Sequence, residues 1–351
     1  MENQKLLNTN LDGLNWETIA QYLRKNIDGL GNEPIEVKKF PAGYSNLTYL
    51  IKLGDWEAVL RRPPFGMIPP KAHDMEREYR ILTKLYPVFP LAPKPYLFCE
   101  DPAIMEKHFY VMEKKEGYVL DEDLPAEFGS SEQVGKTISE AVIHTLVQLH
   151  EIDIEKANLM DIGRPEGYLE RQVHGWIKRY HQSKTDQILG IEEIENYLIA
   201  NIPVSPKATI VHNDFKLNNM MFNQSNPSKV VGVFDWELCT IGDPLTDLGS
   251  ALAYWTEEGE AETGLTSVTN QPGFLKRKDL IELYAKNSNR DLSNIDYYIT
   301  FAFFKIATIL QQIYYRYKMG EIQDERFKNL NIGISNLIYQ AVNAKNKTLL
   351  Q

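Results

Sequence analysis

A short polar segment between two apolar runs constrains this chain more than any other feature. It extends from His212 to Asn219 and has the pattern H-x-D-x-x-x-x-N, with Asp214 as its acid. Sixteen residues further on, the apolar run Val230–Phe234 ends in Asp235. Phosphoryl transfer from a nucleotide needs such a set, because one acid orients the attacking hydroxyl while a second acid and an amide bind magnesium through oxygen.

An ordinary polar loop, in which Asp and Asn only cap turns, is the alternative interpretation. The acid at the end of a strand and the β-rich segment upstream favour phosphoryl transfer. We therefore predict that Asp214 is the catalytic base and that Asn219 and Asp235 bind Mg²⁺. Lys216 lies two residues beyond the base and can reach the transferring phosphate. A role as an ordinary surface lysine is the alternative for Lys216.

Length and charge limit the possible partners. The chain has 351 residues, enough for two lobes, and a formal net charge of −10. Acidic proteins are poor non-specific nucleic-acid binders, so we expect no nucleic-acid partner. The sequence shows no apolar run of membrane-spanning length and no secretory signal at its start, so we expect a cytoplasmic protein without a membrane partner. Two cysteines cannot build a disulfide framework or a cysteine zinc site.

The order of predicted elements indicates an α+β chain with two lobes. The first third is rich in short strands, with one helix at Met75–Leu85. The predicted strands are Ile35–Phe40, Leu47–Leu53, Glu57–Arg62, Pro95–Glu100 and Phe109–Glu113. After Gly117 we expect a helix capped by Ser131 that extends to His150, then short buried strands at Ile210–Val211, Met220–Phe222 and Val230–Phe234. The chain is mostly helical from Leu280, and a ligand is expected in the cleft between lobes.

Several segments resemble a known family. Beyond the polar segment, Ile241-Gly242-Asp243-Pro244 and Asp247-Leu248 are similar to the signature of the aminoglycoside phosphotransferase and choline kinase family. The closest resemblance is to the kinase domains of acyl-CoA dehydrogenase fusion proteins. It is carried by Gly43–Tyr49, Val59–Pro64, Glu76–Arg80, Phe109–Glu113, Gly163–Pro165 with Tyr168, Glu170–Val173 and Asp235–Leu238. The resemblance covers about residues 30 to 320.

That resemblance implies a bilobal protein-kinase-like fold. Its small antiparallel β-sheet N-lobe would be residues 1–115 and would bind the nucleotide. Its larger, mainly helical C-lobe would be residues 116–351 and would carry catalysis and substrate binding. It further implies that ATP is the phosphate donor and Mg²⁺ the cofactor, and that the protein has a functional link to an acyl-CoA dehydrogenase. His212, Asp243 and Asp247 belong to the structural motif.

The nucleotide-binding residues also follow from the resemblance. A loop over the phosphates would consist of Gly43, Tyr44, Ser45 and Asn46, although an ordinary hairpin is the alternative. Arg61 stands where most kinases carry Lys, and Glu78 would pair with it, with Glu76 as the rival. Met112 would lie behind the adenine, whose edge the backbone of Glu113 and Lys115 would bind.

Two positions depart from the family pattern. Asn213 replaces the usual Gly before the catalytic acid, and a left-handed turn is still plausible there because Asn tolerates it. Trp236 and Glu237 replace the Phe-Gly that follows the magnesium acid in protein kinases, so a Gly-dependent flip is not expected.

The substrate is expected to be a small molecule. Gly242-Asp243-Pro244 follows Asp235 almost at once and no A-P-E occurs, which argues against a protein kinase. A basic excess in residues 163–184 suits an anionic acceptor, although a solvated helix face is the alternative. The substrate-binding candidates are Arg164, Arg171, Trp236 and Glu237.

Several alternatives for the acceptor and the activity are open. Members of the fusion-protein subgroup phosphorylate the hydroxyl of hydroxyacyl-CoA, so the resemblance implies that class. An aminoglycoside, choline or a sugar is the alternative acceptor. A non-catalytic nucleotide binder is disfavoured because Asp214 and Asp235 are both present. The aromatic stretch Tyr297–Tyr317 is expected to be core rather than the lining of an acyl pocket.

Overall fold

The computed structural model describes residues 11–40, 46–66, 73–265 and 267–350. The chain forms two compact units. The first contains the residues up to 116 together with 232–237, and the second contains 117–231 and 238 onward. The segment around Asp235 therefore belongs to the first unit, although its neighbours in sequence belong to the second.

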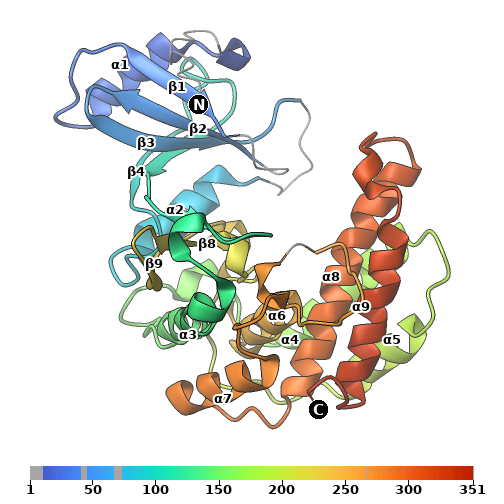
Figure 1. The fold of residues 1–351 in the computed structure, drawn as a ribbon. Coiled ribbons are helices and arrows are strands. Elements are labelled where there is room, and N and C mark those ends of the chain that lie inside the picture. Colours follow the sequence, from blue (N-terminus) through green and yellow to red (C-terminus); the bar gives the residue numbers. More distant parts are fainter. Residues whose placement is uncertain (1–10, 41–45, 67–72, 266, 351) are drawn as a thin grey trace. The chain divides into compact units, whose positions relative to one another are not determined.

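The first unit is built on a five-stranded antiparallel sheet with the order β1-β2-β3-β5-β4 (Figure 1). Its strands are β1 Ile35–Lys39, β2 Leu47–Leu53, β3 Trp56–Arg62, β4 Pro95–Cys99 and β5 Phe109–Glu113. Its helices are α1 Trp16–Asn26 and α2 Met75–Leu85. Asp74 begins α2 by accepting a hydrogen bond from the backbone nitrogen of Arg77 at 2.9 Å.

Alternation along the strands determines which side chains reach the functional face. Tyr49, Ile51 and Leu60 are fully buried in one apolar cluster with Trp16 of α1. Because successive side chains point to opposite faces, Arg61 is directed away from the face on which Leu60 packs. The strand register places Arg61 opposite Thr48 on one side and Tyr110 on the other.

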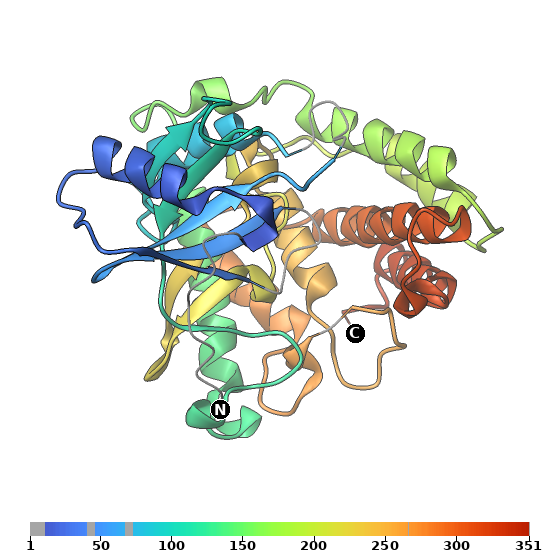
Figure 2. The same cartoon turned by 90° about the horizontal axis from the view of Figure 1, so that it is seen from above.

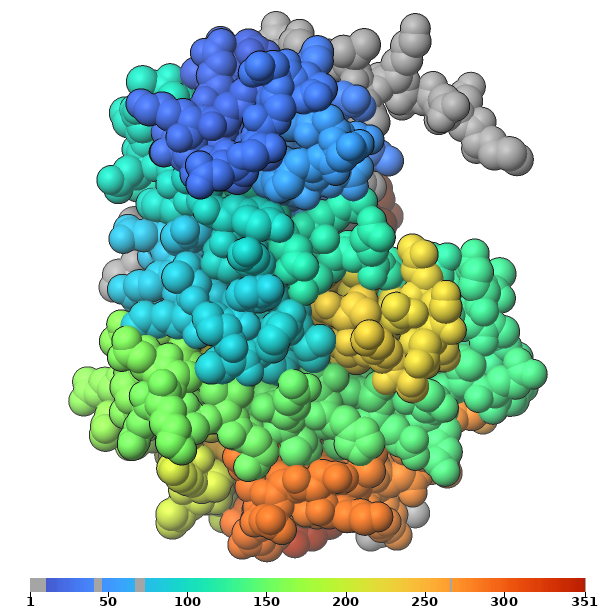
Figure 3. Space-filling view, turned by 90° about the vertical axis from the view of Figure 1, so that its left-hand side faces the viewer, coloured from blue at the N-terminus to red at the C-terminus, as the bar shows by residue number. Residues whose placement is uncertain are grey.

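The second unit is mainly helical. Its helices are α3 Ser131–His150, α4 Tyr168–Ser183, α5 Ile191–Ala200, α6 Leu245–Tyr254, α7 Arg277–Ser288, α8 Ile295–Lys318 and α9 Leu330–Lys345. Its strands are β6 Tyr118–Val119, β7 Thr209–Val211, β8 Met220–Asn223, β9 Asn226–Val233 and β10 Thr240–Gly242, and the last two residues of β9 belong to the first unit. Strands β7 and β10 pair antiparallel, and β6, β8 and β9 form a second small sheet. Figure 3 shows the β8–β9 hairpin in yellow at the surface, beside the green segment that follows β6.

Helices α8 and α9 lie side by side as a hairpin near the end of the chain (Figures 1 and 2). The aromatic side chains in the first half of α8 are buried, as expected for core. They are Tyr297, Tyr298, Phe301, Phe303 and Phe304. This helix therefore supplies a rigid wall for the second unit.

The α+β class predicted from the sequence is confirmed, and several element bounds need correction. The residue that caps α3 is Ser130 rather than Ser131, because the Ser130 backbone nitrogen donates to the Gln133 side chain in a capping box. Strand β9 begins at Asn226, before the apolar residues that indicated it. Within the described residues, no helix is long and apolar enough to cross a membrane.

Candidate active site

The polar segment forms a tight loop between β7 and β8 that brings three predicted residues together. The Lys216 ammonium lies 3.1 Å from Oδ2 of Asp214. Nδ2 of Asn219 donates to the backbone oxygen of Asp214 at 2.9 Å and to its Oδ2 at 3.0 Å. Because the amide nitrogen binds Asp214, the amide oxygen is the atom that Asn219 can offer to a cation. The Asp214 side chain keeps 19% of its surface exposed, so an acceptor hydroxyl can reach it.

Asp247, at the start of α6, holds this loop through hydrogen bonds to its backbone. Its Oδ2 accepts the backbone N–H of His212 at 2.5 Å, and its Oδ1 accepts that of Asn213 at 2.7 Å. Burial alone would raise the pKa of Asp247, but the hydrogen bonds from the His150 side chain and the His212 backbone oppose it and the pKa is lowered. Asp247 is therefore an ionised acceptor that fixes two successive amides ahead of Asp214.

Asn213 adopts the left-handed backbone that the family pattern assigns to Gly, with φ of 68°. Both the oxygen and the nitrogen of its side-chain amide form hydrogen bonds. Oδ1 accepts from the Tyr168 hydroxyl at 2.6 Å, and Nδ2 donates to the Leu238 carbonyl at 2.9 Å. The backbone oxygen of Asn213 accepts from Lys305 at 2.6 Å. These bonds stabilise a turn that costs more for Asn than for Gly.

Asp243 lies just before α6 and connects that helix to α8. Its Oδ1 accepts from the Leu245 backbone at the start of α6, and its Oδ2 accepts from the Tyr298 hydroxyl at 2.7 Å. Burial raises the pKa of Asp243, and the hydrogen bonds oppose that rise. Asp243 thus ties the start of α6 to α8.

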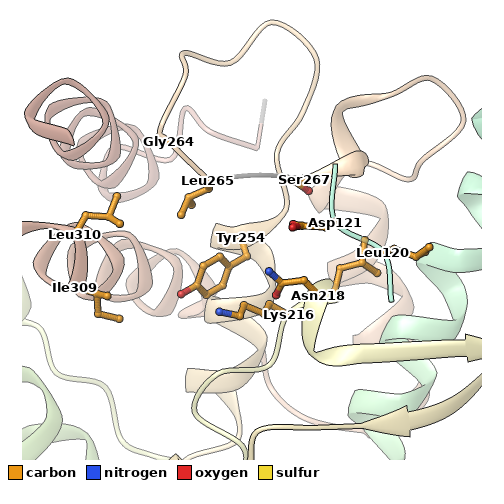
Figure 4. A pocket seen from close by; sticks show the side chains of 11 residues that line it. Leu120, Asp121, Lys216, Asn218, Tyr254, Gly264, Leu265, Ser267, Ile309 and Leu310 are labelled. Atoms are coloured by element: carbon orange, nitrogen blue, oxygen red, sulfur yellow. The ribbon is translucent and has the colours of Figure 1, made fainter. Parts of the chain in front are cut away.

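A pocket of about 230 Å³ borders Lys216 within the second unit (Figure 4). Its polar edge includes Asp121, Lys216, Asn218 and Ser267. Its apolar side includes Leu265, Ile309 and Leu310. Tyr254 lies between these two parts, with its ring centroid 5.0 Å from the Lys216 ammonium. The α8 residues that line this pocket, Ile309 and Leu310, are aliphatic, and no aromatic side chain of that helix is among the lining residues.

Tyr254 is also close to the predicted base. Burial raises the pKa of its hydroxyl well above the usual range, and the charge of Asp214 together with a hydrogen bond to it raises it further. The Tyr254 hydroxyl is therefore protonated and can donate to Asp214. No motif in the sequence singled out Tyr254, which is the last residue of α6.

Arg61 is the centre of a second charged cluster, in the first unit. Its Nη1 lies 2.9 Å from Oε1 of Glu78, and its Nη2 lies 2.8 Å from Oδ1 of Asp235. Glu76 is exposed, so Glu78 is the helix acid that pairs with Arg61. Burial would lower the pKa of Arg61, but Glu78 and the other acids raise it well above its ordinary value. Burial raises the pKa of Glu78 to about 7 against the opposing charge of Arg61.

Asp235 and the two residues after it extend that cluster. Asp235 has a φ of 66°, which Asp tolerates better than most residues. Oε2 of Glu237 lies 3.8 Å from Arg61 and accepts from Nδ2 of Asn46 at 3.1 Å. Trp236 is 1% exposed, and its indole nitrogen donates to the Val233 carbonyl at 2.8 Å. Trp236 is a predicted substrate-binding candidate. Its burial indicates that the side chain packs within the first unit.

The other predicted nucleotide-binding residues that the structure describes lie in the first unit as well. Gly43, Tyr44 and Ser45 fall outside the described residues, whereas Asn46 is buried. Met112 is buried on β5, opposite Val59. The backbone nitrogen of Glu113 donates to the Lys94 carbonyl at 2.8 Å, so this amide is occupied by the sheet. Lys115 places its ammonium 2.9 Å from Oε2 of Glu113.

Two basic residues of α4, Arg171 and Arg179, have local partners. The guanidinium of Arg171 donates to the backbone carbonyl of Glu166 and, at 2.5 Å, to that of Arg164. Arg179 lies over the Trp176 ring at 4.4 Å. These contacts support the interpretation of a helix face with structural roles for Arg171 and Arg179.

The donor chemistry fits a hard divalent cation. Asp235 offers a carboxylate and Asn219 an amide oxygen, the ligand types that Mg²⁺ prefers. Asp235 belongs to the first unit and Asn219 to the second. Among the residues that the structure describes, no group of three or more His, Cys, Asp or Glu residues could hold a metal ion.

The chain is similar to proteins of known families. Residues 36–270 match the model of the phosphotransferase enzyme family. Acyl-CoA dehydrogenase family member 11 of Mus musculus is 34% identical over 318 residues, which is 88% of this chain and 40% of the relative. The chain thus spans about 40% of the length of that curated relative.

Solved structures show the same kinase-like fold. A candidate aminoglycoside phosphotransferase from Ralstonia eutropha aligns with a TM-score of 0.79 and 28% identity, covering 93% of this chain and 98% of the other. Choline kinase from Cryptosporidium parvum aligns with a TM-score of 0.60 and 16% identity, covering 96% of this chain and 100% of the other. A mutant aminoglycoside phosphotransferase in complex with ADP and hygromycin B also aligns with a TM-score of 0.60. Its sequence identity is 12%, and the alignment covers 93% of this chain and 98% of the other.

Proposed function

The chain belongs to the phosphotransferase enzyme family, and on that premise we propose that it transfers the γ-phosphate of ATP to a hydroxyl group of a small molecule. One observation carries the proposal. Lys216 contacts the predicted base Asp214 at 3.1 Å and also lines a pocket of about 230 Å³, so a small acceptor in that pocket would lie beside the base. A pocket of this size suits a small molecule or part of one.

Each residue of the catalytic loop has a defined role in this proposal. Asp214 orients the acceptor hydroxyl and accepts its proton, and Asp247 keeps the loop in place through the backbone amides before Asp214. Lys216 stabilises negative charge on the transferring phosphoryl group. Asn219 and Asp235 would hold Mg²⁺, which supplies positive charge to the phosphate oxygens when it is bound.

The first unit would bind the nucleotide. Arg61 neutralises phosphate with a guanidinium that Glu78 orients, and Asn46 belongs to the loop that would cover the phosphates together with Gly43, Tyr44 and Ser45. Met112, Glu113 and Lys115 would surround the adenine. Residues 1–115 would then form the nucleotide-binding lobe and residues 116–351 the catalytic lobe. ADP in a structural neighbour supports ATP as the donor.

A hydroxyacyl-CoA is the acceptor class that we favour. The pocket joins a polar edge beside Lys216 to an aliphatic side of Leu265, Ile309 and Leu310, which suits a hydroxyl carried on an acyl chain. A polycationic aminoglycoside would be better served by several acids, whereas Asp121 is the one acid among the described residues that line this pocket. A curated relative named as an acyl-CoA dehydrogenase supports a functional link to that enzyme.

The experiment is a screen of ATP turnover with Mg²⁺ against hydroxyacyl-CoA esters, aminoglycosides, choline and sugars. Product formation with a hydroxyacyl-CoA supports the favoured acceptor. Exclusive turnover of an aminoglycoside, choline or a sugar would replace it with the corresponding alternative. Nucleotide binding without transfer to any acceptor would indicate a non-catalytic binder.

A further inference from the structure

One side of the acceptor pocket comes from a long connection rather than from a helix or strand. Residues 255–276 link α6 to α7, and within them only the single turn Val268–Asn270 is helical among the described positions. This connection contributes Gly264, Leu265 and Ser267 to the pocket. The shape of the pocket therefore depends on whatever fixes these residues.

Helix α9 contacts the connection directly before the pocket-lining residues. A Cβ atom added to Gly333 would lie 2.3 Å from the backbone oxygen of Thr263 and 3.4 Å from the backbone nitrogen of Gly264. Only glycine lets the backbone of α9 approach this closely. Three residues further along the same helix, Nδ2 of Asn336 donates to the Glu262 carbonyl at 2.6 Å. The two contacts fix adjacent peptide groups of the connection.

A separate contact, from α7, fixes the connection at Glu260. The Arg277 side chain is 1% exposed, and its guanidinium bonds both carboxylate oxygens of Glu260, with Nη2 to Oε2 at 2.8 Å. Its Nε donates to the Leu252 carbonyl at 2.8 Å. Glu260 is thus held by α7, whereas Glu262 and Thr263 are held by α9. Of the contacts from α7 and α9, those from α9 are the closer in sequence to Leu265, whose own backbone nitrogen donates to Oγ1 of Thr263 at 3.4 Å.

We propose that helix α9 determines acceptor specificity, because Gly333 and Asn336 fix the wall of the pocket that contains Leu265. The inference rests on the proposed function, since it concerns the same acceptor site. The family match ends at residue 270, so α9, Ile309 and Leu310 all lie beyond it. The part of the chain outside the family match would then decide which acceptor fits, while the matched part carries the transfer.

The decisive variant is Gly333→Ala, with Gly175→Ala as its matched control. Both glycines lie inside long helices, but a Cβ at Gly175 meets nothing within 4 Å. Alanine favours a helix at either position, so the two variants differ in the clash with Thr263. Asn336→Ala is the second variant, because it removes one hydrogen bond without adding an atom.

Two readouts are needed. Hydrogen exchange measured by mass spectrometry should rise at residues 262–265 in Gly333→Ala and Asn336→Ala, and stay unchanged in Gly175→Ala. Steady-state kinetics with hydroxyacyl-CoA esters of increasing acyl length should show the acceptor KM rising about tenfold, the size of a misfit of roughly one methylene in an apolar pocket. The KM for Mg-ATP should not change.

The direct pocket variants Leu265→Ala and Leu310→Ala separate the inference from the proposed function. If they change the acceptor KM and the two α9 variants do not, α9 does not set specificity while the proposed function stands. Unchanged exchange at residues 262–265 in both α9 variants would also overturn the inference. If the wild-type protein phosphorylates no acceptor, the proposed function fails and the specificity claim fails with it.

Discussion

The ammonium group of Lys305 donates a hydrogen bond to the backbone oxygen of Asn213 at 2.6 Å. This bond joins the middle of α8 to the residue immediately before the predicted base. Lys305 is 9% exposed and lies 5.7 Å from the Trp176 ring centroid. Burial lowers the pKa of Lys305, and the charges of Asp214 and Asp247 oppose that effect. The buried Lys305 side chain thus holds the left-handed turn from which Asp214 projects.

Lys305→Met should therefore impair catalysis without impairing nucleotide binding. The Asn213 carbonyl loses its donor, and a displacement of the base by about 1 Å costs about a hundredfold in turnover. We expect kcat to fall by roughly that factor while the KM for Mg-ATP stays constant. Lys305→Arg should restore part of kcat. Steady-state kinetics together with thermal unfolding would check this, and an unchanged kcat in a folded Lys305→Met protein would disprove the role.

Arg61 should be a phosphate-positioning residue. Its guanidinium bonds Glu78 and Asp235 through separate nitrogens, a geometry that the point charge of lysine cannot reproduce. Arg61→Ala should raise the KM for Mg-ATP or lower turnover markedly, and Arg61→Lys should retain part of the activity. Nucleotide titration and initial rates on the three proteins provide the measurement. Equal activity in all three would make Arg61 an ordinary structural residue.

His150 should make stability fall in mild acid. Burial lowers its pKa, so the folded state resists a proton that the unfolded state accepts below about pH 6.5. The contribution is complete above that pH and is lost as the pH falls through the folded pKa, with a limiting slope of about 1.4 kcal/mol per pH unit.

Denaturant unfolding between pH 5 and 8 tests this effect. His150→Gln should flatten the loss of unfolding free energy below about pH 6.5, whereas His174→Gln, at an exposed position on α4, should leave the slope as in the wild type. Parallel slopes in the wild type and His150→Gln would assign the acid sensitivity to other groups.

Local patterns were sufficient to predict much of the fold. Leu47–Leu53 and Met75–Leu85 form the predicted strand and helix, because alternation and helical periodicity are properties of neighbouring residues. The grouping of Asp214, Lys216 and Asn219 was also predictable, since all three lie in one short loop.

Long-range packing could not be predicted in the same way. Lys305 lies 92 residues from Asn213, and its one signal in the sequence is a charge within an apolar helix. The contact of Gly333 with Thr263 has no signal in the local pattern, because a glycine inside a helix does not reveal what approaches it. Trp236 was considered for substrate binding from its place in a motif, whereas its burial depends on packing within the first unit.

The most direct test of the central claim is the phosphorylation of the acceptor by Asp214→Asn, measured by mass spectrometry, beside Asp235→Asn as the comparison. Asp214 orients the hydroxyl, so its loss should strongly reduce transfer while calorimetry still shows Mg-ATP binding. Asp235→Asn should weaken Mg-ATP binding as well as transfer. If Asp214→Asn phosphorylates the acceptor at the wild-type rate, Asp214 is not the base and the proposed mechanism is wrong.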